Sequence, residues 1–238
     1  MDGAGKRNWT YSEYLNLREL LELQGEDRGI SSDEMHFIIV HQTFELWFKQ
    51  IIRELSEARN ILGQENVPEN DIPVAVDHLC RTTEIFRLMA NQWTVLETLT
   101  PQGFLSFRDG LGTASGFESY QMREFEILIG LENSDRLGGM DPLDSFRKMA
   151  ERGEADSGIL AHLEKMKELP SLYESLMDWI ERTPIMGSVY GSEGDEESVS
   201  AYIDAHLEAH KEICDSASGS SEMMAERMRA VHEGAKSF

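Results

Sequence analysis

Cysteine, proline and basic residues are scarce in this chain of 238 residues. It has 2 cysteines, 6 prolines, and 22 Lys and Arg residues against 44 Asp and Glu residues, for a formal net charge of −22. Cys80 and Cys214 lie far apart without CxxC spacing, so we expect neither a disulfide framework nor a cysteine-based zinc site, and we expect a cytoplasmic protein. The negative charge repels phosphate backbones and anionic lipids, which argues against a nucleic-acid or membrane partner.

Long hydrophobic runs and common catalytic motifs are also missing. No segment approaches the roughly 18 apolar residues that a membrane span needs, and the first residues lack the apolar stretch of a signal peptide. The sequence contains no Walker A loop, HExxH, GxSxG or calcium-binding loop. Gly110, Gly112 and Gly116 form a GxGxxxG pattern. It follows a predicted helix rather than a strand, so it predicts a helix-to-helix loop and not dinucleotide binding.

The patterns that are present are typical of an all-α protein. Apolar residues recur at three- and four-residue spacings, which predict helices. These helices are expected at about residues 11–24, 33–62, 74–99, 102–111, 118–131, 170–181, 198–215 and 221–233, with weaker helices in the more polar stretch 141–168. Ser31 or Ser32 is expected to cap the helix 33–62, which is the most apolar and therefore the central one. No alternating strand pattern or internal repeat occurs.

Two polar side chains in apolar surroundings are candidates for function. His41 lies in the central helix with Gln42 and Glu45, and polar groups are costly there. It is either a hydrogen-bonded core histidine or a histidine that faces an apolar pocket. Arg108 is either a surface cation paired with Asp109 or a binder of a substrate carboxylate, which its planar guanidinium suits.

Three further histidines stand in the last part of the chain. His206 and His210 are four residues apart and share one helix face, so they either bind a metal or belong to a solvated face. His232 lies near the end of the last predicted helix, where an exposed histidine is unremarkable. Trp93, on an amphipathic helix, is typical of core packing.

Longer runs of residues point to a known family. They are residues 11–17, residues 33–49 with the run HQTFELWFK, the run QWTVLETLTP at 92–101, Phe107-Arg108-Asp109, and residues 115–117 and 170–174. In this order they resemble the tryptophan 2,3-dioxygenase family of heme enzymes over most of the first 180 residues. The resemblance implies an all-α helical bundle with the indole dioxygenase fold in an intertwined homo-oligomer, a homotetramer. It also implies a heme cofactor and the cleavage of the indole ring of L-tryptophan by O₂ to N-formyl-L-kynurenine, a step of tryptophan catabolism in the kynurenine pathway.

The resemblance also implies roles for single residues. His41 is the catalytic residue, which hydrogen-bonds the indole N–H, and Arg108 binds the substrate carboxylate. The other substrate-binding residues are Phe37, Phe104, Leu111 and, from a neighbouring subunit, Tyr11, Tyr14 and Leu15. The heme lies against Trp93, Ser115 and Gly116, and His232 is the axial iron ligand, with His206 and His210 as the alternatives. Residues 1–32 are thus expected to form an arm that contacts a neighbouring subunit, and residues 33–238 a helical heme- and substrate-binding domain.

Other functions remain compatible with these residues. A relative within the same family could insert one oxygen atom into tryptophan or a related indole. A heme-free helical homologue could keep the core motifs without catalysis, and a helical protein could bind a non-heme metal through His206 and His210.

Overall fold

The computed structural model describes residues 8–112, 116–133, 141, 143–153 and 157–216. These residues form helices joined by loops, without a strand, which confirms the all-α prediction for the described part of the chain. The α-helices are α1 Tyr11–Leu15, α2 Leu17–Leu20, α3 Ser32–Leu62, α4 Ile72–Leu96, α5 Pro101–Phe107, α6 Tyr120–Ile129, α7 Asp144–Glu151, α8 Ser157–Lys167, α9 Leu172–Arg182 and α10 Asp195–Ser216. Short 3₁₀ helices lie at Glu26–Arg28 (η1), Arg108–Leu111 (η2) and Gly116–Glu118 (η3).

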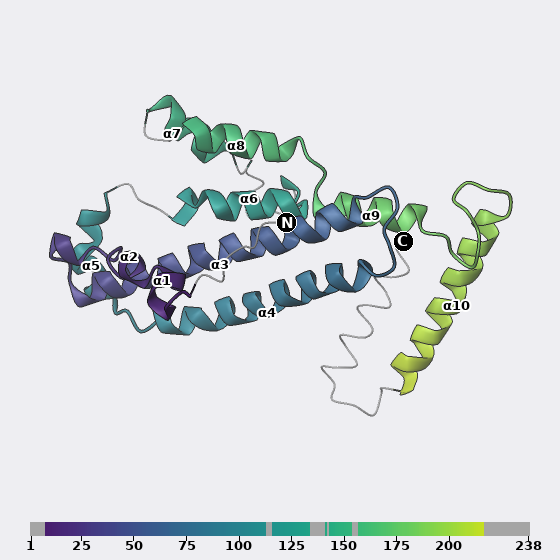
Figure 1. Cartoon of the computed structure of the whole chain (residues 1–238), viewed down its shortest axis with the longest axis horizontal. Helices are drawn as coiled ribbons and strands as arrows, with labels where there is room; N and C mark the ends of the chain where they lie inside the picture. Colours follow the sequence, from purple (N-terminus) through teal and green to yellow (C-terminus); the bar gives the residue numbers. More distant parts are fainter. Residues whose placement is uncertain (1–7, 113–115, 134–140, 142, 154–156, 217–238) are drawn as a thin grey trace. The chain divides into compact units, whose positions relative to one another are not determined.

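The chain divides into two compact units, residues 1–176 and 177–238. In the first unit, α3 and α4 lie side by side, and α6 lies along another side of α3 and carries α8 (Figure 1). The apolar side chains between α3, α4 and α6 form the main core, built on Ile51, Leu55, Ile85, Met89 and Leu128. The prediction that the helix 33–62 is central is therefore confirmed within this unit. None of the described helices is both long and apolar enough to cross a membrane.

The start of α3 follows the sequence prediction closely. Ser31 has an extended backbone, and its hydroxyl accepts a hydrogen bond from the backbone N–H of Glu34 at 3.1 Å. This is the geometry of an N-cap, which satisfies one of the free N–H groups of the first turn. Thr100 caps α5 in the same way, with Pro101 at the first helical position. Both caps fix the ends of helices that carry predicted site residues.

The prediction of one helix over residues 11–24 is wrong. Asn16 has a φ of +48°, in the left-handed region, and separates α1 from α2. Asparagine reaches this region at a lower cost than most residues, so it can end a helix that the apolar pattern alone would continue. Thr10 and Glu13 form a capping box at the start of α1. The predicted helix 102–111 likewise ends at Phe107 and continues as the 3₁₀ turn η2.

Candidate functional site

Three phenylalanine rings from α3 and α5 form an aromatic cluster. The ring centroid of Phe37 lies 5.8 Å from that of Phe104 and 5.6 Å from that of Phe107, and the last two rings pack edge to face at 5.5 Å. These distances are in the favourable range for aromatic pairs. Phe107 is buried, so the cluster anchors the end of α5 on the first turns of α3.

His41 lies against this cluster, one helical turn after Phe37. The two ring centroids are 4.0 Å apart, and the Nδ1–H of His41 donates a hydrogen bond to the Phe37 carbonyl oxygen at 2.8 Å. Because a carbonyl can only accept, this bond places the proton of a neutral imidazole on Nδ1. Nε2 has no partner among the described residues. In the neutral ring it is therefore a free acceptor, which is what an N–H donor of a ligand requires.

Arg108 follows the buried Phe107 and begins η2. Its side chain is exposed, and Nη1 donates to the Gly112 carbonyl oxygen at 3.2 Å. Gly112 has a φ of +59°, which a glycine adopts without strain. Within the described residues Arg108 makes no ion pair with Asp109, so the surface-pair alternative finds no support there. The remaining N–H groups of the guanidinium are available to a carboxylate.

Helix α4 is held against α3 at the level of His41. The Gln92 Nε2 donates to the Val40 carbonyl oxygen at 3.2 Å, and the His36 Nε2 lies 3.2 Å from the Val95 carbonyl oxygen. Trp93 packs its ring 5.2 Å from that of Phe44 and is still 54 % exposed. The indole of Trp93 is thus a half-exposed apolar surface next to Phe44, and it is not the core residue that its helix pattern predicted.

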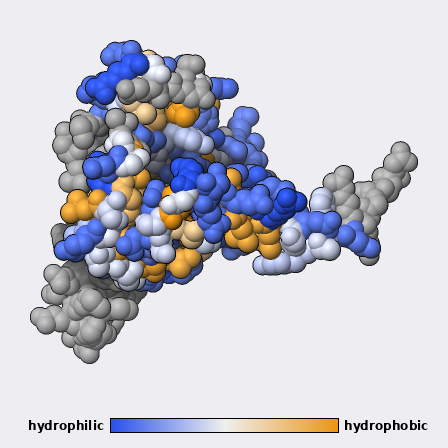
Figure 2. All heavy atoms as spheres, turned by 90° about the vertical axis from the view of Figure 1, so that its left-hand side faces the viewer, coloured by the Kyte–Doolittle hydropathy of each residue, from blue (hydrophilic) through white to orange (hydrophobic). Residues whose placement is uncertain are grey.

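The N-terminal segment, residues 8–31, is attached to α3 next to His41. The Gln42 Nε2 donates to the Leu23 carbonyl oxygen, and the Gln42 Oε1 accepts from the Gln24 Nε2, both at 2.9 Å. Tyr11 and Tyr14, by contrast, are 76 % and 72 % exposed. Figure 2 views the end of the bundle that carries α1, α2 and α5, and apolar side chains lie on this face among hydrophilic ones.

The other predicted site residues are more scattered. Leu111 is half-buried in η2, and Gly116 is exposed at the start of η3. Ser115 and His232 lie outside the described residues. His206 and His210 follow each other along α10, with ring centroids 5.8 Å apart. Within the described part of the chain, no group of three or more His, Cys, Asp or Glu side chains could hold a metal ion.

Phe107 was not among the predicted site residues, although its ring contacts those of both Phe37 and Phe104. Its position three residues after Phe104 places both rings on one face of a helix, and this spacing is the signal that could have found it.

A comparison with protein families shows to which family the chain belongs. A family model described as Tryptophan 2,3-dioxygenase matches residues 2–237. The chain belongs to the tryptophan 2,3-dioxygenase family. This confirms the resemblance on which the site residues were assigned, and it extends that resemblance beyond the first 180 residues.

Curated relatives support the same assignment to the tryptophan 2,3-dioxygenase family. The chain is 40 % identical over 189 residues to tryptophan 2,3-dioxygenase 2 of Ralstonia nicotianae, covering 75 % of this chain and 50 % of that protein. It is 38 % identical over 191 residues to tryptophan 2,3-dioxygenase of Sorangium cellulosum, covering 76 % and 45 %. For the enzyme of Anopheles gambiae the identity is 36 % over 178 residues, covering 73 % and 44 %. The chain thus spans about half the length of these relatives.

Members of the tryptophan 2,3-dioxygenase family depend on heme. The residues around His41 fit one face of such a group, because a porphyrin is a flat, largely apolar ring and the exposed indole of Trp93 offers a matching surface. Two described histidines of α3, His36 and His41, lie near this surface. Each uses one ring nitrogen in a hydrogen bond to a backbone carbonyl. The predicted axial ligand, His232, lies outside the described residues.

Proposed function

We propose that this chain binds heme and L-tryptophan and catalyses the cleavage of the indole C2–C3 bond by O₂, which yields N-formyl-L-kynurenine. The observation that carries the proposal is the grouping of His41, with Nε2 free to accept, the three phenylalanine rings and the guanidinium that follows Phe107. These groups match tryptophan, whose indole N–H needs an acceptor, whose ring needs apolar walls and whose carboxylate needs a cation.

The residues of the chain orient the substrate and exclude water. Arg108 binds the carboxylate through two parallel N–H groups, which fixes the orientation of the amino acid. The Nε2 of His41 accepts the indole N–H, while the bond from Nδ1–H to the Phe37 carbonyl oxygen holds the ring in this tautomer. The aromatic cluster keeps the pocket apolar. When bound, heme would supply the redox-active iron for the chemistry of O₂.

This proposal is tested by heme reconstitution followed by turnover of L-tryptophan under air. A Soret band and N-formyl-L-kynurenine as the product are expected. A product with one added oxygen and an intact ring would instead favour the mono-oxygenating relative. Absence of a Soret band after reconstitution would favour the heme-free helical homologue.

Replacing His41 by alanine is expected to reduce turnover without abolishing it, because the side chain contributes one hydrogen bond to the substrate. Such a bond contributes about 0.5–1.5 kcal/mol, so kcat/KM is expected to fall roughly 2- to 13-fold. The variant is also expected to discriminate less between tryptophan and 1-methyltryptophan, which lacks the N–H. Heme content is the control, and loss of heme in this variant would show that His41 is an iron ligand instead.

His232 is proposed as the axial ligand, in line with the family resemblance. His232→Ala is expected to remove the heme absorbance spectrum, because the side chain proposed to hold the heme would then be missing. A His206→Ala/His210→Ala double variant, which removes two histidines of α10, is expected to keep the spectrum. The reverse result would assign the iron to α10, and retention of heme in both variants would exclude both assignments.

The N-terminal arm, residues 1–32, is proposed to complete the site of a neighbouring subunit in a homotetramer, with residues 33–238 as the heme- and substrate-binding domain. Two observations support this: Tyr11 and Tyr14 are largely exposed in the single chain, and the segment is attached to α3 at Gln42, next to His41. Exposed apolar side chains of this kind are typical of surfaces that another molecule covers.

A further inference from the structure

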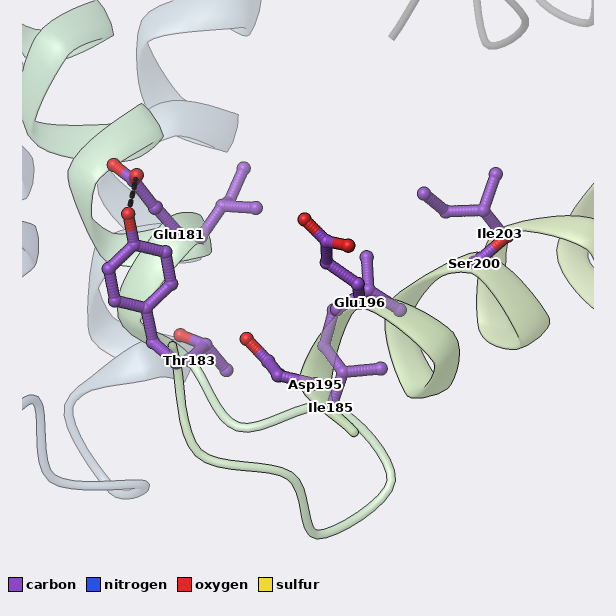
Figure 3. A pocket seen from close by; sticks show the side chains of 10 residues that line it. Glu181, Thr183, Ile185, Asp195, Glu196, Ser200 and Ile203 are labelled. Atoms are coloured by element: carbon purple, nitrogen blue, oxygen red, sulfur yellow. Dashed lines mark hydrogen bonds between the residues drawn. The ribbon is translucent and has the colours of Figure 1, made fainter. Parts of the chain in front are cut away.

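A cavity of about 450 Å³ lies within the unit that begins at residue 177. It opens between the end of α9, the loop after α9 and the first turns of α10 (Figure 3). The residues that line it are Ile180, Glu181, Thr183, Ile185, Tyr190, Asp195, Glu196, Val199, Ser200 and Ile203. None of them belongs to the site around His41.

The walls of this cavity are apolar and branched. Ile180, Ile185, Val199 and Ile203 contribute them, together with the ring of Tyr190. Figure 3 shows Ile185 and Ile203 on different sides of the opening. A volume of this size lies in the range of pockets that bind small molecules. The apolar walls therefore favour a ligand with a compact hydrophobic body.

The charges around the cavity have one sign. Three carboxylates, those of Glu181, Asp195 and Glu196, line it, and no Lys, Arg or His residue does. The Tyr190 hydroxyl donates to the Glu181 Oε1 at 2.6 Å, and the Asp195 Oδ2 accepts from the backbone N–H of Gly191 at 2.9 Å. For Glu196 the described part of the chain offers no ion-pair partner.

Tyr190 contributes an uncharged aromatic ring to the cavity. Its hydrogen bond to Glu181 and the charge of that carboxylate raise the pKa of the phenol above its usual value. The ring therefore remains an uncharged aromatic face at neutral pH, which is the form that attracts a cation.

A bare metal ion does not match this arrangement. In the described part of the chain the carboxylates do not converge into a group of three that could hold a metal ion. They are distributed around apolar walls, so a matching ligand joins a positive charge to a hydrophobic body. We propose that this cavity binds a small organic ammonium ion that carries an aromatic or branched apolar group.

The proposal is tested with 2-phenylethylammonium, its neutral analogue 2-phenylethanol and its anionic analogue 3-phenylpropionate, each titrated into the full chain. Methyl NMR of the isoleucines reports the location, since Ile180, Ile185 and Ile203 line the cavity. The ammonium ion is expected to bind about tenfold more tightly than the alcohol, since two or three exposed charge pairs each contribute up to about fivefold. The carboxylate is expected not to bind.

Added salt and single charge-removing substitutions distinguish binding in this cavity from non-specific attraction of a cation to an acidic protein. Binding of the ammonium ion is expected to weaken in 0.5 M salt, while binding of the alcohol is not. Glu196→Gln is expected to weaken it about three- to fivefold. Glu212→Gln makes the same change on α10, roughly 24 Å farther along the helix, and is expected to have no effect.

Three results would overturn the proposal: equal affinity for the ammonium ion and the alcohol, shifts confined to methyl groups outside the cavity, and equal effects of Glu196→Gln and Glu212→Gln. This inference is independent of the proposed dioxygenase function. Arg108→Leu is expected to leave ammonium binding unchanged, so failure of one proposal does not carry over to the other.

Discussion

Replacing Arg108 by leucine is expected to weaken the binding of L-tryptophan by about 2–4 kcal/mol, or roughly 30- to 1000-fold, because the substrate carboxylate then enters an apolar site without its cation. Heme content is expected to remain unchanged, since within the described residues the hydrogen bond of the guanidinium goes to the Gly112 carbonyl oxygen. Isothermal titration or spectral titration of the heme-loaded protein measures the difference.

Two comparisons make this result specific to the carboxylate. Arg108→Lys keeps the charge without the two parallel N–H groups and is expected to lose less affinity than leucine. Arg53→Leu removes an exposed arginine from α3 and is expected to have no effect. If wild-type protein binds tryptamine as tightly as tryptophan, then Arg108 does not bind the substrate carboxylate.

Replacing Glu54 by alanine is expected to lower the free energy of unfolding by about 3 kcal/mol. The Glu54 carboxylate is 4 % exposed and lies between α3 and α4, where it accepts from the His78 Nδ1 at 2.6 Å and from the Arg81 Nη1 at 2.8 Å. Gln50 donates to it as well. Removal of the buried carboxylate costs three hydrogen bonds and leaves the partly buried His78 without its acceptor. Urea unfolding at neutral pH measures the effect.

An exposed ion pair on α4, the helix that packs against α3, is the matched control for this substitution. Glu84 and Arg87 of α4 form a pair in which both side chains are 67 % exposed. Glu84→Ala is expected to change the free energy of unfolding by less than about 1 kcal/mol, because water replaces the lost contact. Equal effects of the two substitutions would show that the network at Glu54 does not hold α3 and α4 together.

The contribution of Glu54 is also expected to depend on pH. Burial alone would raise the pKa of this carboxyl, but the hydrogen bonds from His78, Arg81 and Gln50 and the charge of Arg81 outweigh burial and hold the pKa below its usual value of 4.5. A lowered pKa in the folded state stabilises the protein above the pKa of the unfolded state. This stability is lost as the pH falls below 4.5. The difference in the free energy of unfolding between the unchanged protein and the Glu54→Gln variant is therefore expected to be constant near neutral pH. It is expected to shrink on acidification.

The sequence predicted the parts of the fold that depend on local patterns. The cap at Ser31, the length of α3 and the helix that begins near Pro101 follow from periodicity and from capping residues, which act within one turn. The break at Asn16 was missed because the apolar pattern continues through it, and a single left-handed residue leaves no trace in periodicity.

The contacts that hold α3 and α4 together could not be predicted in this way. Glu54 contacts side chains 24 and 27 residues later, and Gln92 bonds a carbonyl 52 residues earlier. Such pairs depend on how two helices are aligned, and one sequence carries no signal for that alignment. The roles of His41 and Arg108 came from family resemblance, since a histidine in an apolar helix and an arginine near a turn have several physical explanations.

The continuity of α3 limits how the sequence can vary in length. His41 and Glu54 lie on the same unbroken helix of 31 residues, which is about 46 Å long. Inserting or deleting one residue between them would rotate one relative to the other by about 100° and shift it by about 1.5 Å. Either His41 would leave the phenylalanine rings or Glu54 would leave His78 and Arg81. Insertions and deletions are therefore expected in the loop between α3 and α4 rather than between these two positions.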